Sequence, residues 1–262
     1  MRAKKRLLLL MTIIACVMAT SPVFAKSMQV ICKIKYESPY SHWTYRFTYR
    51  KDNGLMKRCI MNDTPQYYVS YFYNKDGSMK ALRDYGDEGL EGTQTFKYAA
   101  NGKLAAVDID RIENGKSIYT NALKYKWGNT SCKVTMTELA PETYKFDATG
   151  RLVQDTLAIT DGTVKYRYYY DENGYVRSRK IIANAGDQKS TYTTKYENKY
   201  KNNLLSKVRY TDEEGFNNIS FIYKTIEVPS EFVSKVQAQQ DYVLHYCVID
   251  YSPNYFTTPA MW

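Results

Sequence analysis

The sequence predicts an all-β fold: an antiparallel meander of about 14 to 16 strands, built from hairpin repeats of about 24 residues and rolled into a curved sheet, followed by one short C-terminal helix. Between residues 45 and 224 the chain repeats one phrase: two aromatics separated by one residue, a polar turn, and an apolar residue two places beyond the turn glycine. The aromatics alternate with polar residues, which is the period of a strand. Glycine, asparagine and aspartate end each run, as tight hairpin turns require.

The first 25 residues have the three parts of a secretory signal peptide, which we expect to be removed. Four basic residues lie between positions 2 and 6, a mostly apolar run follows over residues 7–18, and small residues lead to Ala25. This apolar run is too short to span a bilayer, which needs about 20 residues. The signal predicts export to the periplasm, the outer membrane or the extracellular space.

A second interpretation of the N-terminus stays open. Ile13-Ile14-Ala15-Cys16 resembles the lipobox of bacterial lipoproteins, in which the cysteine becomes the lipidated first residue. In that case Cys16 would anchor the protein to a membrane. The cleavage site at Ala25 is the better fit to the sequence.

Residues 26–225 are predicted to form one β-hairpin repeat domain, with a first strand over residues 28–36. A second set of turns lies midway between the repeat turns, so each period holds two strands and two reversals. Open sheets rarely exceed about 10 strands without curling, and burial of each aromatic ring is worth a few kcal/mol. We therefore expect the sheet to roll up around its aromatic face. The clearest copies of the phrase are Tyr71 to Met79, Phe96 to Leu104, Tyr144 to Leu152 and Tyr168 to Val176.

The last part of the chain departs from the repeat. One late copy has Asn202-Asn203 in place of the turn glycine, and asparagine tolerates the left-handed conformation that such a turn needs. Pro229 and Ser230 predict the start of a short helix, with Ser230 as its cap. The apolar run over residues 242–249 predicts a buried strand. We interpret residues 226–262 as a C-terminal cap over the last repeat.

Charge and cysteine content bound the possible partners. The net charge is +10, and removal of the signal peptide with its four basic residues leaves +6. Lysine and arginine are scattered along the strands, which predicts a solvated sheet face and no nucleic-acid binding. Cys32, Cys59, Cys132 and Cys247 remain after cleavage. They could be buried free thiols or form disulfides in any of three pairings, and their spacing resembles no zinc motif.

The phrase Tyr-x-Phe-Asp-x-x-Gly-Arg-Leu at residues 144–152 resembles the YD repeat of the Rhs and teneurin group, and residues 166–176 are a second match. This resemblance implies a rolled β-hairpin sheet and an envelope setting, with the tyrosines and glycines as scaffold and no inherited catalytic residue. Asp147 and Asp171 alone hold the repeat's aspartate, and Arg151 alone holds its arginine. The chain lacks the toxin module of that group, so no closed shell around a cargo is expected.

The same rhythm is also similar to MORN-like repeats, including those of certain bacterial antitoxins. Those proteins are normally cytosolic. The predicted export signal argues against that assignment.

No constellation of residues predicts catalysis. His42 and His245 are expected to be structural; His245 and Cys247 share a face of the predicted strand, but nothing predicts the exposed, electropositive niche that a reactive thiolate needs. Asp108 and Asp110 lie about 7 Å apart on one strand face, near the spacing of glycosidase acids, yet are expected to face solvent.

The turn at Asp171, Asn173 and Gly174 echoes part of a calcium loop, but it is too short to supply the full set of ligands. Its side chains fit an Asx-stabilised turn better. We expect no metal and no cofactor.

Most tyrosines should line the inside of the rolled sheet. If any aromatic residues are exposed, Tyr169, Tyr175, Trp43 and Trp127 are the first candidates. The sequence therefore predicts an exported, non-enzymatic β-repeat protein that acts as a binding or structural module at the bacterial cell envelope. Its expected partner is an envelope glycan or protein, and it does not span a membrane once the signal is removed. Two alternatives stay open: an enzyme acting on glycans or peptidoglycan, and an immunity-like accessory of a secreted toxin system.

Overall fold

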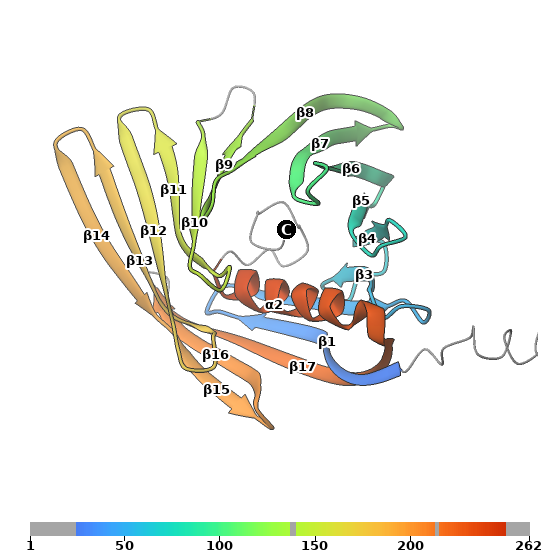
Figure 1. Ribbon diagram of the computed structural model, residues 1–262. Coiled ribbons are helices and arrows are strands. Elements are labelled where there is room, and N and C mark those ends of the chain that lie inside the picture. The colour runs from blue at the N-terminus through green and yellow to red at the C-terminus, as the bar shows by residue number, and fades with distance from the viewer. Residues whose placement is uncertain (1–24, 137–139, 213–214, 250–262) are drawn as a thin grey trace, which may run out of the picture.

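The computed structural model describes residues 25–136, 140–212 and 215–249. These residues form one antiparallel sheet of 17 strands that curls into a nearly closed barrel, with a helix on its inner side (Figure 1). The predicted signal peptide, the lipidation site at Cys16 and the end of the predicted cap lie outside the described residues. The all-β, rolled-sheet fold predicted from the sequence is confirmed.

The strands are β1 (Ala25–Glu37), β2 (His42–Tyr49), β3 (Met56–Met61), β4 (Tyr68–Tyr73), β5 (Met79–Gly86), β6 (Gly89–Tyr98), β7 (Leu104–Glu113), β8 (Lys116–Trp127), β9 (Ser131–Thr135), β10 (Glu142–Phe146), β11 (Leu152–Ile159), β12 (Gly162–Tyr170), β13 (Val176–Ala185), β14 (Gln188–Lys195), β15 (Glu197–Lys201), β16 (Leu204–Asp212) and β17 (Gly215–Pro229). A 3-10 turn, η1 (Ser230–Phe232), and one helix, α2 (Val233–Ile249), follow them.

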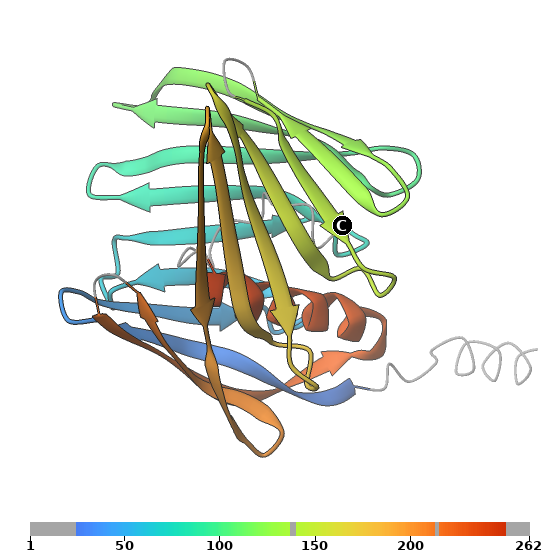
Figure 2. The same cartoon turned by 90° about the vertical axis from the view of Figure 1, so that its left-hand side faces the viewer.

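Each strand pairs with the next along the chain from β1 to β14 and again from β15 to β17. The ring closes through a long ladder between β17 and β1, which runs from Ala25↔Pro229 to Glu37↔Asn218. β14 and β15 are separated only by Tyr196, but β14 pairs with β13 whereas β15 pairs with β16. This change of partner divides the segment into two strands, which is one reason why the sheet has more than the predicted 14 to 16. The sheet is strongly coiled, since β12 to β14 run steeply across the direction of β3 to β7 (Figure 2).

The predicted inner layer of aromatic rings is present. The leading aromatic of each repeat copy points into the barrel and is at most 8% exposed. These residues are Phe47, Tyr71, Phe96, Tyr125, Tyr144, Tyr168 and Phe221. In the copy without a turn glycine, Asn198 holds this position. The apolar residue two places beyond each turn glycine is also buried, so the repeat phrase is a packing unit.

The second aromatic of the phrase links neighbouring repeats. The hydroxyl of Tyr73 donates to the carbonyl of Met56 at 2.9 Å, and that of Tyr98 donates to Met79 at 2.8 Å. In both cases the acceptor is the buried apolar residue that follows the previous repeat turn. Trp127 with Leu104, Tyr170 with Leu152 and Tyr223 with Leu205 make the same contact. In these five copies the repeat spacing brings a side-chain donor to a backbone carbonyl of the preceding repeat. Two copies differ, since Phe146 has no donor and the Tyr200 hydroxyl donates to the Asp171 carboxylate.

The repeat turns are stabilised by their own polar side chains. Gly77 and Gly174 adopt left-handed φ angles of 82° and 83°, a conformation that costs glycine little. In the copy without glycine, Asn202 and Asn203 take φ angles of 51° and 62°, as predicted. Asp171 Oδ1 accepts the backbone N–H groups of Asn173 and Tyr175, which confirms an Asx turn at that site.

The C-terminal prediction was wrong in two respects. Residues 242–249 are the second half of α2 and do not form a strand. A short apolar run fits either element, and here the rolled sheet offers a helix apolar surroundings on most of its surface: Tyr242, Val243, Leu244 and Cys247 are all buried. Pro229, rather than Ser230, is the N-cap residue of η1, and no side-chain cap hydrogen bond forms there.

α2 is anchored to the sheet by two glutamines. Gln240 Oε1 accepts the backbone N–H of Ile31 at 2.7 Å, and Gln239 Oε1 accepts that of Met56 at 3.2 Å. Both residues are nearly fully buried. They satisfy sheet donors that would otherwise be buried without a partner, which is costly. β17 runs through residue 229, across the boundary predicted between residues 225 and 226.

Candidate functional site

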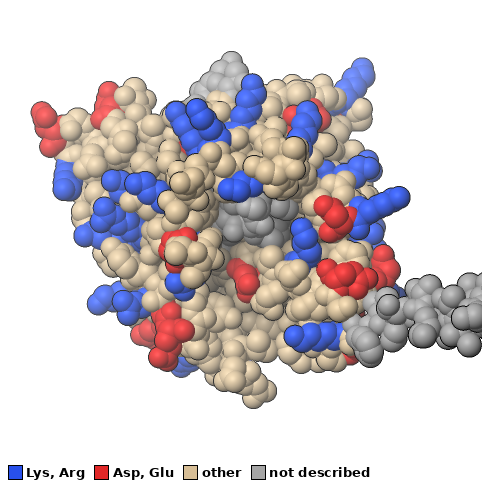
Figure 3. Space-filling view, viewed as in Figure 1, with Lys and Arg blue, Asp and Glu red and all other residues tan. Residues whose placement is uncertain are grey.

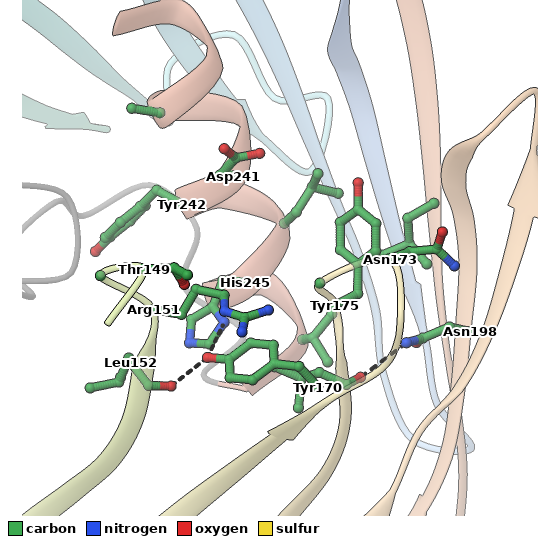
Figure 4. Close-up of a pocket in the computed structure, with 17 residues that line it drawn as sticks. Thr149, Arg151, Leu152, Tyr170, Asn173, Tyr175, Asn198, Asp241, Tyr242 and His245 are labelled. Carbon is green, nitrogen blue, oxygen red and sulfur yellow. Dashed lines mark hydrogen bonds between the residues drawn. The ribbon is translucent and has the colours of Figure 1, made fainter. Parts of the chain in front are cut away.

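A cavity of about 600 Å³ lies between α2 and two repeat turns (Figure 4). The β10–β11 turn contributes Arg151, the β12–β13 turn contributes Tyr175, and α2 contributes Asp241, Tyr242 and His245. Its apolar lining comes from Leu152, Val176, Leu205, Ala238, Leu244 and Val248. An apolar floor with a few convergent polar groups is the usual composition of a small-molecule site.

Three side chains form a stack on one wall of the cavity. The His245 ring lies parallel to the Tyr170 ring, with centroids 5.8 Å apart, and the guanidinium of Arg151 lies 5.0 Å from the same tyrosine ring. The Tyr170 hydroxyl donates to the carbonyl of Leu152 and lies 3.5 Å from His245 Nδ1. Burial lowers the pKa of His245 to about 4, so the imidazole is neutral near pH 7.

Arg151 is held in place by the turn that carries it. Its Nε donates to Asp147 Oδ2 at 2.9 Å, and its backbone N–H donates to Asp147 Oδ1 at 3.0 Å. Burial alone would raise the pKa of Asp147, but the hydrogen bonds from Thr149 and Arg151 outweigh it and hold the pKa at about 2. The guanidinium therefore keeps a charged partner, while its face rests on Tyr170.

The opposite wall is a hydrogen-bonded cluster behind Tyr175. Asn198 Nδ2 donates to Asp171 Oδ2 at 2.7 Å and to the carbonyl of Val176 at 3.1 Å. The Tyr200 hydroxyl donates to the same carboxylate oxygen, and the Tyr175 and Tyr200 rings are 5.8 Å apart. Asn198 Oδ1 is buried, and within the described parts of the chain it has no hydrogen-bond partner.

Asp241 is the carboxylate at the mouth of the cavity. Its Oδ1 accepts a hydrogen bond from Gln237 Nε2 at 2.8 Å. The side chain is exposed, yet the walls around it withdraw water and raise the pKa of the carboxyl group. Burial, together with the negative charges of Asp241 and Asp171, also raises the pKa of Tyr175. A hydroxyl, a carboxyl, a guanidinium and an amide thus converge on a space walled by tyrosine rings.

The chemistry open to this arrangement follows from the side chains that line it. The His245 ring packs against the rings of Tyr168 and Tyr170, and its low pKa makes it a weak base at pH 7. Over residues 25–136, 140–212 and 215–249, no group of three or more histidine, cysteine or acidic side chains is placed to hold a metal ion. The side chains present can donate and accept hydrogen bonds and stack on a flat ligand.

The residues singled out in the sequence lie apart from one another. His42 is exposed on β2 and His245 lies in α2, so they form no pair. His245 and Cys247 do not share a face, because two residues along a helix point about 200° apart. Asp108 binds Lys97 at 2.5 Å and Asp110 accepts from Thr120 at 2.9 Å, so each carboxylate on β7 has its own partner.

The predicted exposed aromatics divide into two groups. Trp43 is 47% exposed and Tyr169 is 40% exposed, as expected. Trp127 and Tyr175 are partly buried: Trp127 stacks on Phe146, and Tyr175 lines the cavity.

The four cysteines of the described chain are free. Burial raises the pKa of Cys132 to about 12 and raises those of Cys59 and Cys247 as well. These thiols are therefore poor nucleophiles at neutral pH.

The sequence does not mark Asp241, Asn198 and Arg151 as cavity residues. Arg151 carried a usable signal, since it is the one arginine that follows a repeat glycine. Asp241 and Asn198 carried none, because Asp241 reaches the cavity through the docking of α2 and Asn198 through the curvature of the sheet.

No protein-family model matches this chain, and no curated protein matches its sequence. Among solved structures, a porin-like protein from Bacteroides vulgatus superposes with a TM-score of 0.55 at 13% identity, over 74% of this chain and 98% of that protein. A porin-like protein from Bacteroides uniformis gives a TM-score of 0.43 at 12% identity, over 74% of this chain and 96% of that one. The TcdB2-TccC3 structure gives 0.30 at 9% identity, over 66% of this chain and 12% of that one. The first of these likenesses is one of fold alone.

Proposed function

We propose that the protein is an exported, non-enzymatic binding module of the bacterial cell envelope, which holds a glycan fragment in the cavity beneath α2. The observation that carries the proposal is the composition of that cavity. The rings of Tyr170, Tyr175 and Tyr242 border it, and Arg151, Asn198 and Asp241 supply polar groups at its edge. Sugar rings present apolar faces for stacking and hydroxyl groups for hydrogen bonding, and the cavity offers partners for both.

The outer face of the sheet supports a setting in water or beside anionic envelope polymers. The residue between the two aromatics of a repeat points outward, and in three copies it is an exposed lysine: Lys97, Lys126 and Lys145. A barrel that spans a membrane has the reverse pattern, with an apolar outer band and a polar interior. We therefore propose that the sheet does not cross a membrane, despite the porin-like fold. In the parts of the chain that the structure describes, no helix is long and apolar enough to cross a membrane.

Basic and acidic residues are interspersed over the surface seen in Figure 3, where lysine and arginine form no single block. Such a surface suits solvation and weak, distributed contacts more than tight binding of a nucleic acid. We also propose that the scaffold is distantly related to YD repeats. The rolled hairpins and the repeat phrase support this relationship.

One observation favours a second candidate, an enzyme that acts on glycans. Asp241 is a carboxyl group of raised pKa at the mouth of a cavity, which is the property of a general acid. Glycosidases ordinarily need a second carboxylate at a defined distance. Asp171 lies behind the opposite wall, where its oxygens accept hydrogen bonds from Asn198, Tyr200 and its own turn.

A glycan array probed with the mature chain tests the main proposal. We expect binding to a defined class of envelope glycan, and Tyr175→Ala should weaken it by about tenfold or more because a stacking wall is lost. Tyr169→Ala is the matched control, since Tyr169 lies on the same hairpin but on the outer face. Absence of binding to any envelope glycan, or equal loss in both variants, would contradict the proposal.

Turnover measurements on the same glycans separate the two candidates. If the protein is a binding module, neither the wild-type chain nor Asp241→Asn should cleave the glycan. Glycan cleavage by the wild-type chain that disappears in Asp241→Asn would instead establish the enzyme.

A further inference from the structure

Among the described strands, none pairs with the edge of β14 that faces away from β13. β14 pairs with β13 from Ser178↔Lys195 to Ala185↔Gln188. The N–H of Tyr196 donates to the carbonyl of Arg177 at 2.9 Å, which fixes the alternation of the ladder. By that alternation the N–H and C=O groups of Thr191, Thr193 and Lys195 point away from β13. Within the described residues, no backbone ladder pairs with that edge.

The neighbouring strand on that side is β16, which diverges from β14. β15 and β16 are paired only as far as Glu197↔Arg209. Beyond that point a groove of about 680 Å³ separates β14 from the β16–β17 hairpin, lined among others by Thr193, Lys195 and Thr211. The Tyr192 hydroxyl reaches across to the carbonyl of Thr211 at 3.5 Å, which is a long contact for a hydrogen bond. The barrel wall is therefore incomplete at this one seam of the described sheet.

We propose that this groove, which we term the β14 seam, is a docking site for an extended segment of a partner protein that carries acidic side chains. The segment pairs with the free edge of β14 as an added strand. Addition of a strand to an exposed sheet edge is a recurrent mode of peptide recognition, in which backbone hydrogen bonds give affinity and alternate side chains give specificity. Natural sheets normally protect a long free edge, whereas residues 188–193 of β14 are exposed on both faces.

The charges around the seam select an acidic occupant. Lys195 and Arg209 line the groove, and Glu197 is the one acidic residue among its lining. Just beyond it, Lys199 and Lys207 stand directly opposite each other in the β15–β16 ladder. Like charges in that arrangement destabilise a sheet, and neither lysine has an ion-pair partner in the described chain. Carboxylates on the outward face of an added strand would neutralise this group.

A second copy of the chain fits the seam less well. It would bring the same lysine-bordered edge, and the chain as a whole carries a net charge of +10. An apolar contact is also available to a partner strand, because Phe216 lines the groove and is 74% exposed. The preferred occupant therefore combines acidic side chains with an apolar one that covers this ring.

Fluorescence anisotropy with synthetic peptides tests the proposal on the mature chain. The probes are a labelled ten-residue peptide that alternates glutamate with valine, and its lysine–valine counterpart. We expect the glutamate peptide to bind at least about tenfold more tightly than the lysine peptide, because the basic residues of the seam attract glutamate and repel lysine. Absence of binding, or equal binding of both peptides, would overturn the proposal.

Two matched variants locate the binding site. Thr193→Pro removes one edge N–H that β13 does not use, so peptide binding should fall by about tenfold, whereas Thr193→Val keeps that N–H and should retain binding. Lys195→Glu changes only an exposed charge and should shift the preference toward the lysine peptide. If Thr193→Pro binds the glutamate peptide as tightly as the wild type, or if Lys195→Glu keeps the same preference between the two peptides, the peptide binds outside the β14 seam and the proposal is wrong. Sedimentation of the wild-type chain as a dimer that Thr193→Pro dissociates would assign the seam to a second copy instead.

Discussion

The interior around α2 and the tip of the β13–β14 hairpin belong to the same sheet, but they are stabilised very differently. Around α2 the leading aromatics are buried, several second aromatics such as Tyr73 and Tyr98 donate to a carbonyl of the preceding repeat, and the helix packs against this inner layer. At the β14 tip, residues 188–193 are exposed on both faces, and no strand of the described chain pairs with one of the two backbone edges. The repeat phrase therefore stabilises the end of each hairpin that carries the glycine turn, and leaves the opposite end open to solvent and to partners.

The largest expected effect comes from removing one ring at each of these two places. Tyr71 is 1% exposed, so Tyr71→Ala should lower the free energy of unfolding by about 3–5 kcal/mol. Tyr192 is 40% exposed, and Tyr192→Ala should cost less than about 1 kcal/mol. Urea denaturation of both variants measures the difference. Equal losses would mean that the two ends are stabilised alike.

Protonation of His245 should weaken the α2 end selectively. The pKa of this residue is 6.5 when unperturbed and about 4 in the folded chain, so the unfolded chain binds more protons between those values. Stability should therefore fall as the pH is lowered from 6.5 to 4, by roughly 2–3 kcal/mol after allowance for the partial exposure of the ring. His245→Phe keeps the ring packing and cannot be protonated.

The measurement is the free energy of unfolding by urea at several values between pH 7 and pH 4. The difference between wild type and His245→Phe isolates the histidine from the carboxylates that titrate below it. Parallel pH profiles for the two proteins would show that the imidazole is not held neutral by burial.

The sequence was sufficient to predict the parts of the fold that repeat. The aromatic phrase predicted the inner layer, and the Asx and asparagine turns at Asp171 and Asn202 were predicted from local chemistry. These features depend on local backbone conformation and on the two-residue period of a strand, so the local sequence is enough to predict them. The hydrogen bonds from Tyr73 and Tyr98 join neighbouring repeats, but their acceptors are backbone atoms, which leave no mark in the sequence.

The candidate site could not be predicted in the same way. It depends on α2, whose second half has the composition of a strand and becomes a helix only because the rolled sheet surrounds it with apolar groups. Asp241 and His245 reach the cavity through that docking, and Tyr175 and Asn198 reach it through sheet curvature. Neither docking nor curvature is a property of any local segment.

A smaller effect should follow from removing a single inter-repeat hydroxyl. Tyr98→Phe deletes the donor to the carbonyl of Met79 and leaves that acceptor partly buried, so stability should fall by about 1 kcal/mol. Tyr169→Phe, on the outer face, is the control and should change stability by less than about 0.5 kcal/mol. Thermal denaturation monitored by circular dichroism reports both. A neutral Tyr98→Phe would mean that ring packing alone joins the repeats.

The smallest effect we expect is at the turn that positions Arg151. Asp147→Asn keeps an oxygen for the backbone N–H groups of Thr149 and Arg151 but loses the ion pair with the guanidinium. That pair is partly exposed, so the loss at pH 7 should be about 0.5–1 kcal/mol. The folded pKa of Asp147 is about 2 against an ordinary 3.8, so its contribution is present above pH 3.8 and disappears as the pH falls toward 2. Urea unfolding at pH 7 and pH 2.5 should thus show a gap between wild type and variant that narrows in acid. A gap that is the same at both pH values would assign the effect to the geometry of the turn, and Arg151 would then owe its position to Tyr170 instead of to Asp147.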